Sequence, residues 1–143
     1  MKHQLKRILL VDDDKTTNTL NTLVINQTNC AKEIVAVKNG IEALKYLTTP
    51  VNGEYPQPDL VFLDINMPGM DGWEFLEEYN KLSEEYQANV VVVMLTTSLN
   101  PDDRERSLEH VGLDDFMNKP LTINQFKGVI EKNFPELYNE MNG

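Results

Sequence analysis

Five short runs of apolar residues recur along this chain, and a longer amphipathic stretch follows each of them. The runs are apolar almost without interruption, which is typical of strands that are buried on both faces of a parallel sheet. Antiparallel strands with one wet face would instead alternate apolar and polar residues. We therefore predict five buried strands, at Ile8–Val11, Ile34–Val37, Leu60–Leu63, Val90–Leu95 and Asp115–Met117.

The stretches that follow these runs have the residue spacing of surface helices whose apolar stripe faces a core. In the first stretch the spaced residues are Leu20, Leu23, Val24 and Gln27. Asn100-Pro101-Asp102 and Thr122 precede the last two stretches and are favourable helix starts. We predict helices at Thr17–Thr28, Gly40–Leu47, Gly72–Glu85, Arg104–His110 and Ile123–Phe134. This alternation predicts an α/β fold, a doubly wound (βα)5 domain with a five-stranded parallel sheet.

The chain has 143 residues, which is the size of one domain. We expect a single domain over residues 1–143, with its core at about 7–133, a frayed tail at 134–143 and no output domain. The stretch Thr48–Asp59 is rich in proline and is predicted to be a surface loop. No run approaches the ~20 apolar residues of a membrane span, and no signal peptide is recognisable. We expect a cytoplasmic protein without membrane insertion, in agreement with the single cysteine, Cys30.

The charge balance narrows the possible partners. There are 13 Lys and Arg residues against 23 Asp and Glu residues, a formal net charge of −10. Affinity for nucleic acids depends mainly on neutralising backbone phosphates, so we expect no direct nucleic-acid binding. The acidity contributes to solubility through self-repulsion, and some of the carboxylates are candidates to converge on a cation.

Polar side chains follow the apolar runs at the points where the strands are predicted to end. Asp12 and Asp13 follow the first run, Asp64 the third, Thr96 the fourth and Lys119 the fifth. In a doubly wound sheet, ligands bind beyond the carboxyl ends of the strands. Carboxylates that meet there repel one another unless they share a cation, and hard oxygen ligands are those that Mg²⁺ prefers. Together with a lysine and a hydroxyl, such a metal site is suited to bind a phosphoryl group.

Each of these residues also has a purely structural interpretation. Asp12 to Asp14 could cap a helix and complement its dipole, and Asp64 could form an Asx turn before Pro68. Thr96 could help to start the next helix, and Lys119 could be a solvated side chain. Their joint placement at one end of neighbouring strands favours a shared site.

Four segments of the chain resemble the motifs of bacterial response-regulator receiver domains: ILLVDD at 8–13, LDINMPGMDG at 63–72, LTT at 95–97 and NKP at 118–120. The resemblance covers about Arg7–Asn133. It implies a stand-alone, CheY-like receiver domain of two-component signalling, with the flavodoxin-like strand order 2-1-3-4-5.

The resemblance also implies a role for each site residue. Asp64 is the phosphoacceptor, which takes a phosphoryl group from a phosphohistidine of a sensor histidine kinase or a phosphotransfer protein. Asp13, Asp64 and the backbone carbonyl of Asn66 hold Mg²⁺, and Asp12 acts through a coordinated water. Thr96 and Lys119 bind phosphoryl oxygens, and the bond between Lys119 and Pro120 is cis. Such a protein is not an enzyme in the ordinary sense, because it catalyses only its own phosphorylation and dephosphorylation.

In this family the phosphoryl group acts through Thr96 and an aromatic residue, Phe116, on the fourth helix, the fifth strand and the fifth helix. Many members carry tyrosine where this chain has Phe116, so apolar packing alone drives any inward shift of the ring. The alternative is that Phe116 is a core residue in both states. Thr97 stands where many members have alanine or glycine, and we expect its bulk to slow the loss of the phosphoryl group. The downstream target is unknown.

Three other functions compete with this interpretation. A phosphohydrolase with an aspartyl nucleophile needs a second aspartate at the position of Asn66. A calcium loop needs a glutamate at the position of Phe75, and Pro68 fills a ligand position. The third is a receiver-shaped binding module that is never phosphorylated, and the complete set of acids, threonine and lysine argues against it.

Overall fold

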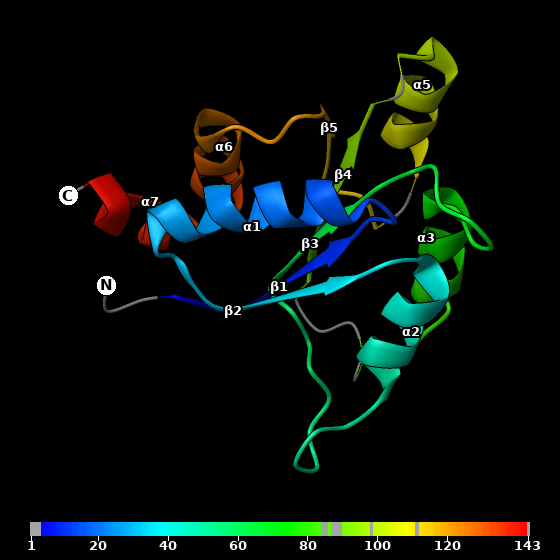
Figure 1. The fold of residues 1–143 in the computed structure, drawn as a ribbon, viewed down its shortest axis with the longest axis horizontal. Coiled ribbons are helices and arrows are strands. Elements are labelled where there is room, and N and C mark those ends of the chain that lie inside the picture. The colour runs from blue at the N-terminus through cyan, green and yellow to red at the C-terminus, as the bar shows by residue number, and fades with distance from the viewer. Residues whose placement is uncertain (1–3, 84–85, 87–89, 98, 111, 143) are drawn as a thin grey trace.

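A computed structural model describes residues 4–83, 86, 90–97, 99–110 and 112–142. Five parallel strands form one sheet in the order β2-β1-β3-β4-β5, which confirms the predicted fold class and strand order (Figure 1). The strands are β1 (Leu5–Val11), β2 (Ala31–Val37), β3 (Leu60–Leu63), β4 (Val91–Thr96) and β5 (Asp115–Asn118). The helices are α1 (Lys15–Thr28), α2 (Gly40–Thr48), α3 (Gly72–Asn80), α5 (Pro101–Glu109), α6 (Ile123–Asn133) and α7 (Pro135–Asn142).

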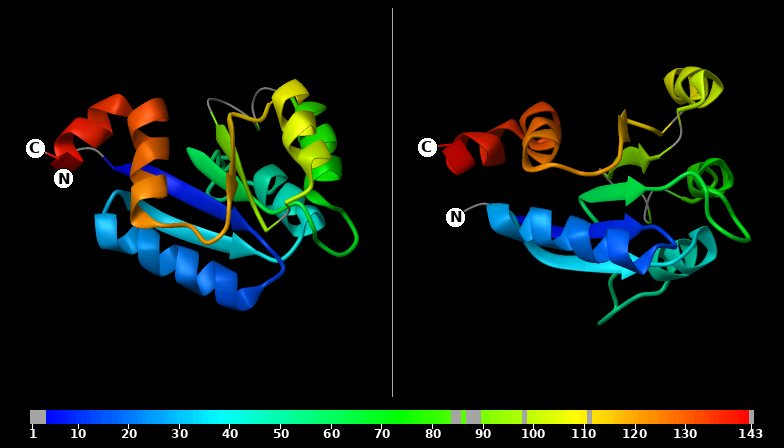
Figure 2. Two further views of the ribbon diagram at one scale, coloured as in Figure 1. Left: turned by 90° about the horizontal axis from the view of Figure 1, so that it is seen from above. Right: turned by 45° about the horizontal axis from the view of Figure 1, so that its top comes forward.

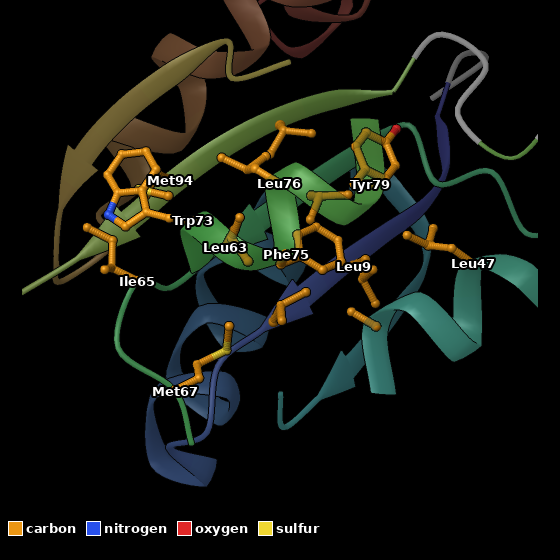
Figure 3. Packing of buried hydrophobic residues seen from close by; sticks show 14 of the residues in the cluster. Leu9, Leu47, Leu63, Ile65, Met67, Trp73, Phe75, Leu76, Tyr79 and Met94 are labelled. Atoms are coloured by element: carbon orange, nitrogen blue, oxygen red, sulfur yellow. The ribbon is translucent and has the colours of Figure 1, made fainter. Parts of the chain in front are cut away.

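Helices cover both faces of the sheet, with α1, α6 and α7 on one side and α2, α3 and α5 on the other (Figure 2). Alternate residues of β1 enter two separate cores. Leu9 packs with Leu47 of α2 and with Phe75 and Leu76 of α3 (Figure 3), whereas Leu10 belongs to the cluster that contains Phe126 of α6. The central strands β1, β3 and β4 bury side chains on both faces, and their sequences contain nearly unbroken apolar runs. The prediction of five buried strands is wrong for the edge strands, because β2 has no buried residue and β5 buries only Phe116.

Three helix starts follow from the predicted capping residues. Asp14 is the N-cap of α1, where its side chain accepts a hydrogen bond from Thr16 N. Asn100 caps α5 with Pro101 in the first turn. Thr122 caps α6 in a capping box with Gln125. These side chains satisfy backbone N–H groups that have no partner within their own helix.

The predicted helix Gly72–Glu85 is too long. Helix α3 ends at Asn80, and the backbone N–H of Lys81 donates to the carbonyls of Glu78 and Tyr79 in its last turn. Residues 84–85 of the predicted helix lie outside the described residues. Helix α3 begins with a capping box, in which Asp71 accepts a hydrogen bond from Glu74 N. Asp71 therefore serves as a helix cap.

Helix α1 turns a different face to the core than its leucine pattern predicts. Leu20 and Leu23 are 54% and 55% exposed, and the buried residues are Asn18, Asn21 and Ile25. The Asn18 side chain donates a hydrogen bond to the backbone carbonyl of Asp12, 2.9 Å away. This bond and the Asp14 cap fix the rotation of the helix, so the polar stripe faces inward. Val24 of the predicted stripe packs against the core, but the expectation is wrong for Leu20, Leu23 and Gln27.

The tail is not frayed. Residues Pro135–Asn142 form α7, which Pro135 begins as a residue suited to a first helical turn. Leu137 is only 4% exposed, and Phe134, Tyr138 and Met141 pack against the same core cluster. Residue 143 lies outside the described residues. The burial of Leu137 holds this segment in place, which a prediction from proline and chain position alone cannot anticipate.

The segment Thr48–Asp59 is mostly a loop, as predicted, between α2 and β3 (Figure 1). Val51 and Glu54 pair across a tight turn whose central residues, Asn52 and Gly53, both have positive φ. Among the described helices, none is long and apolar enough to cross a membrane.

Candidate functional site

The ends of β1 and β3 bring three carboxylates together. Val11 and Leu63 are register partners in these neighbouring strands, so Asp12 and Asp64, which follow them, lie side by side. Carboxylate oxygens of Asp12, Asp13 and Asp64 all lie within 4.8 Å of one another. Asp12 and Asp64 are 4% and 6% exposed, whereas Asp13 is exposed. The cluster therefore reaches from the edge of the core to solvent.

Backbone hydrogen bonds hold the two buried acids in place. Asp12 N donates to Val37 O at 3.1 Å, and Asp64 N donates to Val11 O at 2.9 Å, so both residues continue the sheet ladder. The Asp12 carboxylate accepts a bond from Asp14 N, and the Asp64 carboxylate accepts one from Ile65 N, each at 2.9 Å.

Lys119 supplies the positive charge in the cluster. Its Nζ lies 2.5 Å from Asp12 Oδ2 and 3.5 Å from Asp64 Oδ1, and its side chain is 12% exposed. Its backbone N donates to Thr96 O at 2.8 Å, which ties the end of β5 to the end of β4. The peptide bond between Lys119 and Pro120 is cis, the isomer that the resemblance implies.

The electrostatics of the cluster favour a cation. Burial, and then the neighbouring Asp12 carboxylate, raise the pKa of Asp64 to about 6, and Lys119 and the Ile65 N–H oppose this rise only in part. Three carboxylates face one ammonium, so ionising Asp64 adds negative charge to a site that already repels it. A bound cation would remove that repulsion, and an all-oxygen donor set suits a hard divalent ion.

Gly72 forms one wall of the site. A Cβ built on this residue would lie 2.4 Å from Asp64 O and 3.0 Å from Ile65 Cα. Its backbone N donates to Ile65 O at 2.7 Å. Only glycine permits this close approach of α3 to the chain that carries Asp64.

The remaining predicted residues lie around this cluster. Thr96 is completely buried at the end of β4, and Thr97 is exposed. Asn66 is exposed in the loop between β3 and α3. Asp14 points to the N-terminus of α1 as its cap, which is the structural role considered for it above.

Phe116 is a buried residue of β5, 7% exposed, and belongs to the core cluster of α2 and α3. The Arg104 guanidinium of α5 lies 5.3 Å from the ring centroid, and its Nη1 donates to Phe116 O at 2.9 Å. The ring already lies inward, as in the alternative in which Phe116 is a core residue.

Two residues that border the site are absent from the predicted set. Asn18 and Asn21 of α1 are 7% and 6% exposed and line a cavity together with Asp12 and Asp64. The sequence holds a signal for them, because Asn18, Asn21 and Ile25 follow the spacing of one helix face. The neighbouring leucine pattern obscures that signal.

The fold and the site together define a class: a flavodoxin-like α/β domain with an acidic, lysine-containing cluster at the carboxyl ends of β1 and β3. Comparison with known proteins gives the family within this class. The chain belongs to the response regulator receiver domain family of two-component signalling, whose model matches residues 8–131.

The relatives agree with this assignment. The response regulator Rcp1 of Synechocystis sp. is 36% identical over 107 residues, which are 73% of this chain and 70% of Rcp1. The chain is also 31% identical to a part of the sensor histidine kinase GacS of Pseudomonas protegens, over 88% of this chain but only 13% of GacS. It therefore corresponds to a small part of that kinase.

Solved structures share the fold. A two-component response regulator from Cytophaga hutchinsonii superposes with a TM-score of 0.75 at 29% identity, covering 97% of this chain and 98% of that chain. The Mn(2+)-bound form of Rcp1 superposes with a TM-score of 0.70 at 32% identity, covering 89% of this chain and 92% of that chain. The acidic cluster and this metal-bound neighbour both support divalent-cation binding by the family site.

Proposed function

We propose that this protein is a response regulator that accepts a phosphoryl group on Asp64 from the phosphohistidine of a sensor histidine kinase or a histidine phosphotransfer protein. The observation that carries the proposal is the position of Asp64, whose buried carboxylate lies beside that of Asp12 and 3.5 Å from the Lys119 ammonium. Residues 1–143 would act as one receiver domain in the cytoplasm, with no nucleic acid bound directly and no membrane insertion.

The residues present fit a magnesium ion. Asp13, Asp64 and the carbonyl of Asn66 would hold Mg²⁺, with Asp12 acting through a coordinated water. The all-oxygen donor set and its partly exposed edge match the preference of Mg²⁺ for hard ligands and retained water. When bound, the ion neutralises negative charge on the phosphoryl oxygens.

The chain's own residues perform the transfer by positioning and by charge. A carboxylate oxygen of Asp64 forms the new bond to phosphorus, and the P–N bond to the donor histidine breaks. The histidine nitrogen keeps that electron pair and remains on the donor protein. The Lys119 ammonium and the Thr96 hydroxyl bind the phosphoryl oxygens, where they stabilise charge in the transition state. The product is an acyl phosphate on a carboxylate nucleophile.

Phosphorylation would change partner binding through α5, β5 and α6. Phe116 connects these elements to the core, because its ring packs inside and its carbonyl accepts a bond from Arg104 of α5. The protein would be a signalling phosphoacceptor and no enzyme beyond its own phosphorylation and dephosphorylation. Its downstream target is a protein that recognises this surface.

The experiment is an intact-protein mass measurement after incubation with Mg²⁺ and acetyl phosphate. We expect one added phosphoryl group that requires Mg²⁺, is labile to alkali and is absent from Asp64→Asn. A protein that stays unmodified under all conditions would instead be a receiver-shaped binding module. Modification that persists in Asp64→Asn would assign the phosphoacceptor to another residue.

A further inference from the structure

Helix α1 buries two side-chain amides next to the acidic cluster. Asn18 and Asn21 are 7% and 6% exposed, at positions where a surface helix normally buries apolar residues. Asn18 Nδ2 donates to Asp12 O at 2.9 Å, but Asn18 Oδ1 is fully buried and has no partner in the described part of the chain. A buried acceptor without a hydrogen bond is unfavourable, and an ordered water is one of the partners that satisfy such groups.

A cavity lies at this point of the molecule. It has a volume of about 10 Å³, and Asp12, Asn18, Asn21 and Asp64 line it together with apolar residues of β1, β3 and β4. About 10–15 Å³ is the room that one water molecule needs. Purely apolar cavities stay dry, but this one has amide and carboxylate groups in its wall, enough for the two to four hydrogen bonds of a buried water.

We infer that this cavity is a binding site for a single water molecule, held between α1 and the buried acid pair. The water donates one hydrogen bond to Asn18 Oδ1 and accepts one from the Asn21 amide. Its second hydrogen points to the carboxylate side of the cavity, where Asp12 and Asp64 lie. The cavity is too small for a phosphate or an organic ligand, so the size of the site selects the ligand.

The water site explains the polar inner face of α1. An amide pair that retains a water keeps its hydrogen bonds, whereas a leucine at position 21 would fill the cavity and leave Asn18 Oδ1 unbonded. Asn18 and Asn21 are then positioning residues, which act through the water on the two acids. Their effect on the cation site rests on the proposed function, but the presence of the water does not.

The water is detected by NMR in the metal-free protein. In rotating-frame spectra of the wild type we expect a dipolar cross-peak between water and the Asn18 side-chain amide protons. Its sign is opposite to that of the diagonal, which distinguishes it from a cross-peak caused by proton exchange. Asn21→Leu removes this cross-peak, and Asn26→Leu, the same change at an exposed position of α1, leaves it in place. A wild-type spectrum without any such cross-peak overturns the inference, whether or not the leucine variant folds.

The second readout is Mg²⁺ affinity by calorimetry. Loss of a residue that orients metal ligands typically weakens metal affinity about 10–100-fold. We therefore expect Asn21→Leu to bind Mg²⁺ about tenfold more weakly than wild type. Asn26→Leu should bind Mg²⁺ as tightly as wild type. An unchanged affinity in a folded Asn21→Leu overturns the positioning role. If the wild type showed the water but accepted no phosphoryl group, the proposed function would fail and the water site would stand.

Discussion

The substitution Asp64→Asn is expected to stabilise the protein when no divalent cation is present. Asn keeps an oxygen that can accept the Ile65 N–H bond but removes a charge that the site disfavours. Burial and the Asp12 carboxylate raise the pKa of Asp64 from 3.8 to about 6. In the unfolded chain the same carboxyl titrates near its ordinary value, so the folded protein resists its ionisation.

The magnitude follows from linkage between proton binding and folding. Between pH 3.8 and about 6 the folded protein retains a proton that the unfolded chain has lost, so wild-type stability falls as pH rises through this window. At about 1.4 kcal/mol for each pH unit, ionisation of Asp64 lowers the free energy of unfolding by about 3 kcal/mol above pH 6. The side chain is 8% exposed, so little solvent screening reduces this value.

The assay is urea unfolding in chelator-containing buffer from pH 4 to pH 7.5. We expect the two proteins to converge near pH 4 and Asp64→Asn to be about 3 kcal/mol more stable at pH 7. Glu105→Gln, which removes an exposed carboxylate of α5, corrects for the general relief of a net charge of −10. A stability difference that is independent of pH, or a less stable Asp64→Asn, would refute the reasoning.

Four further predictions test other parts of the account. Lys119→Met removes the ammonium beside two buried acids, and we expect urea unfolding without metal to show a loss of about 3–5 kcal/mol in the free energy of unfolding. A loss within error of zero would contradict the buried ion pair. Gly72→Ala lowers the melting temperature because its Cβ meets Asp64 O. Its control is Gly128→Ala, whose Cβ meets nothing within 4 Å and which adds about 0.5–1 kcal/mol to the free energy of unfolding. Equal effects of the two substitutions would count against the close packing at Gly72. Leu137→Ala costs about 2–5 kcal/mol in unfolding free energy if α7 is docked as described, and an unchanged value would show that it is not. Under the proposed function, Thr97→Ala loses its phosphoryl group faster than wild type in a mass-spectrometric decay series, and identical decay would refute the steric argument.

The sheet and the acidic cluster could be predicted from the sequence for a physical reason. Strands buried on both faces leave nearly unbroken apolar runs, and parallel strands direct their carboxyl ends to one edge of the sheet. Asp12, Asp13, Asp64 and Lys119 therefore meet because of the topology alone. Short capping patterns at Asp14, Asn100 and Thr122 are equally local and were equally predictable.

The rotation of α1 and the docking of α7 could not be predicted in the same way. Leu20 and Leu23 predict an apolar stripe, but Asn18 gains a hydrogen bond to Asp12 O only when the opposite face turns inward. Helix α7 has eight residues, too few to be stable alone. The burial of Leu137 against the rest of the core stabilises it, and that contact is visible only in the fold.

The location of the phosphoryl group tests the central claim most directly. Borohydride reduces an aspartyl phosphate to homoserine, so the acceptor can be read from peptide masses after treatment with Mg²⁺ and acetyl phosphate. The account predicts homoserine at position 64 alone, and none when Mg²⁺ is withheld. Homoserine at Asp12 or Asp13, or no reduced residue in a protein that has gained a phosphoryl mass, would contradict it.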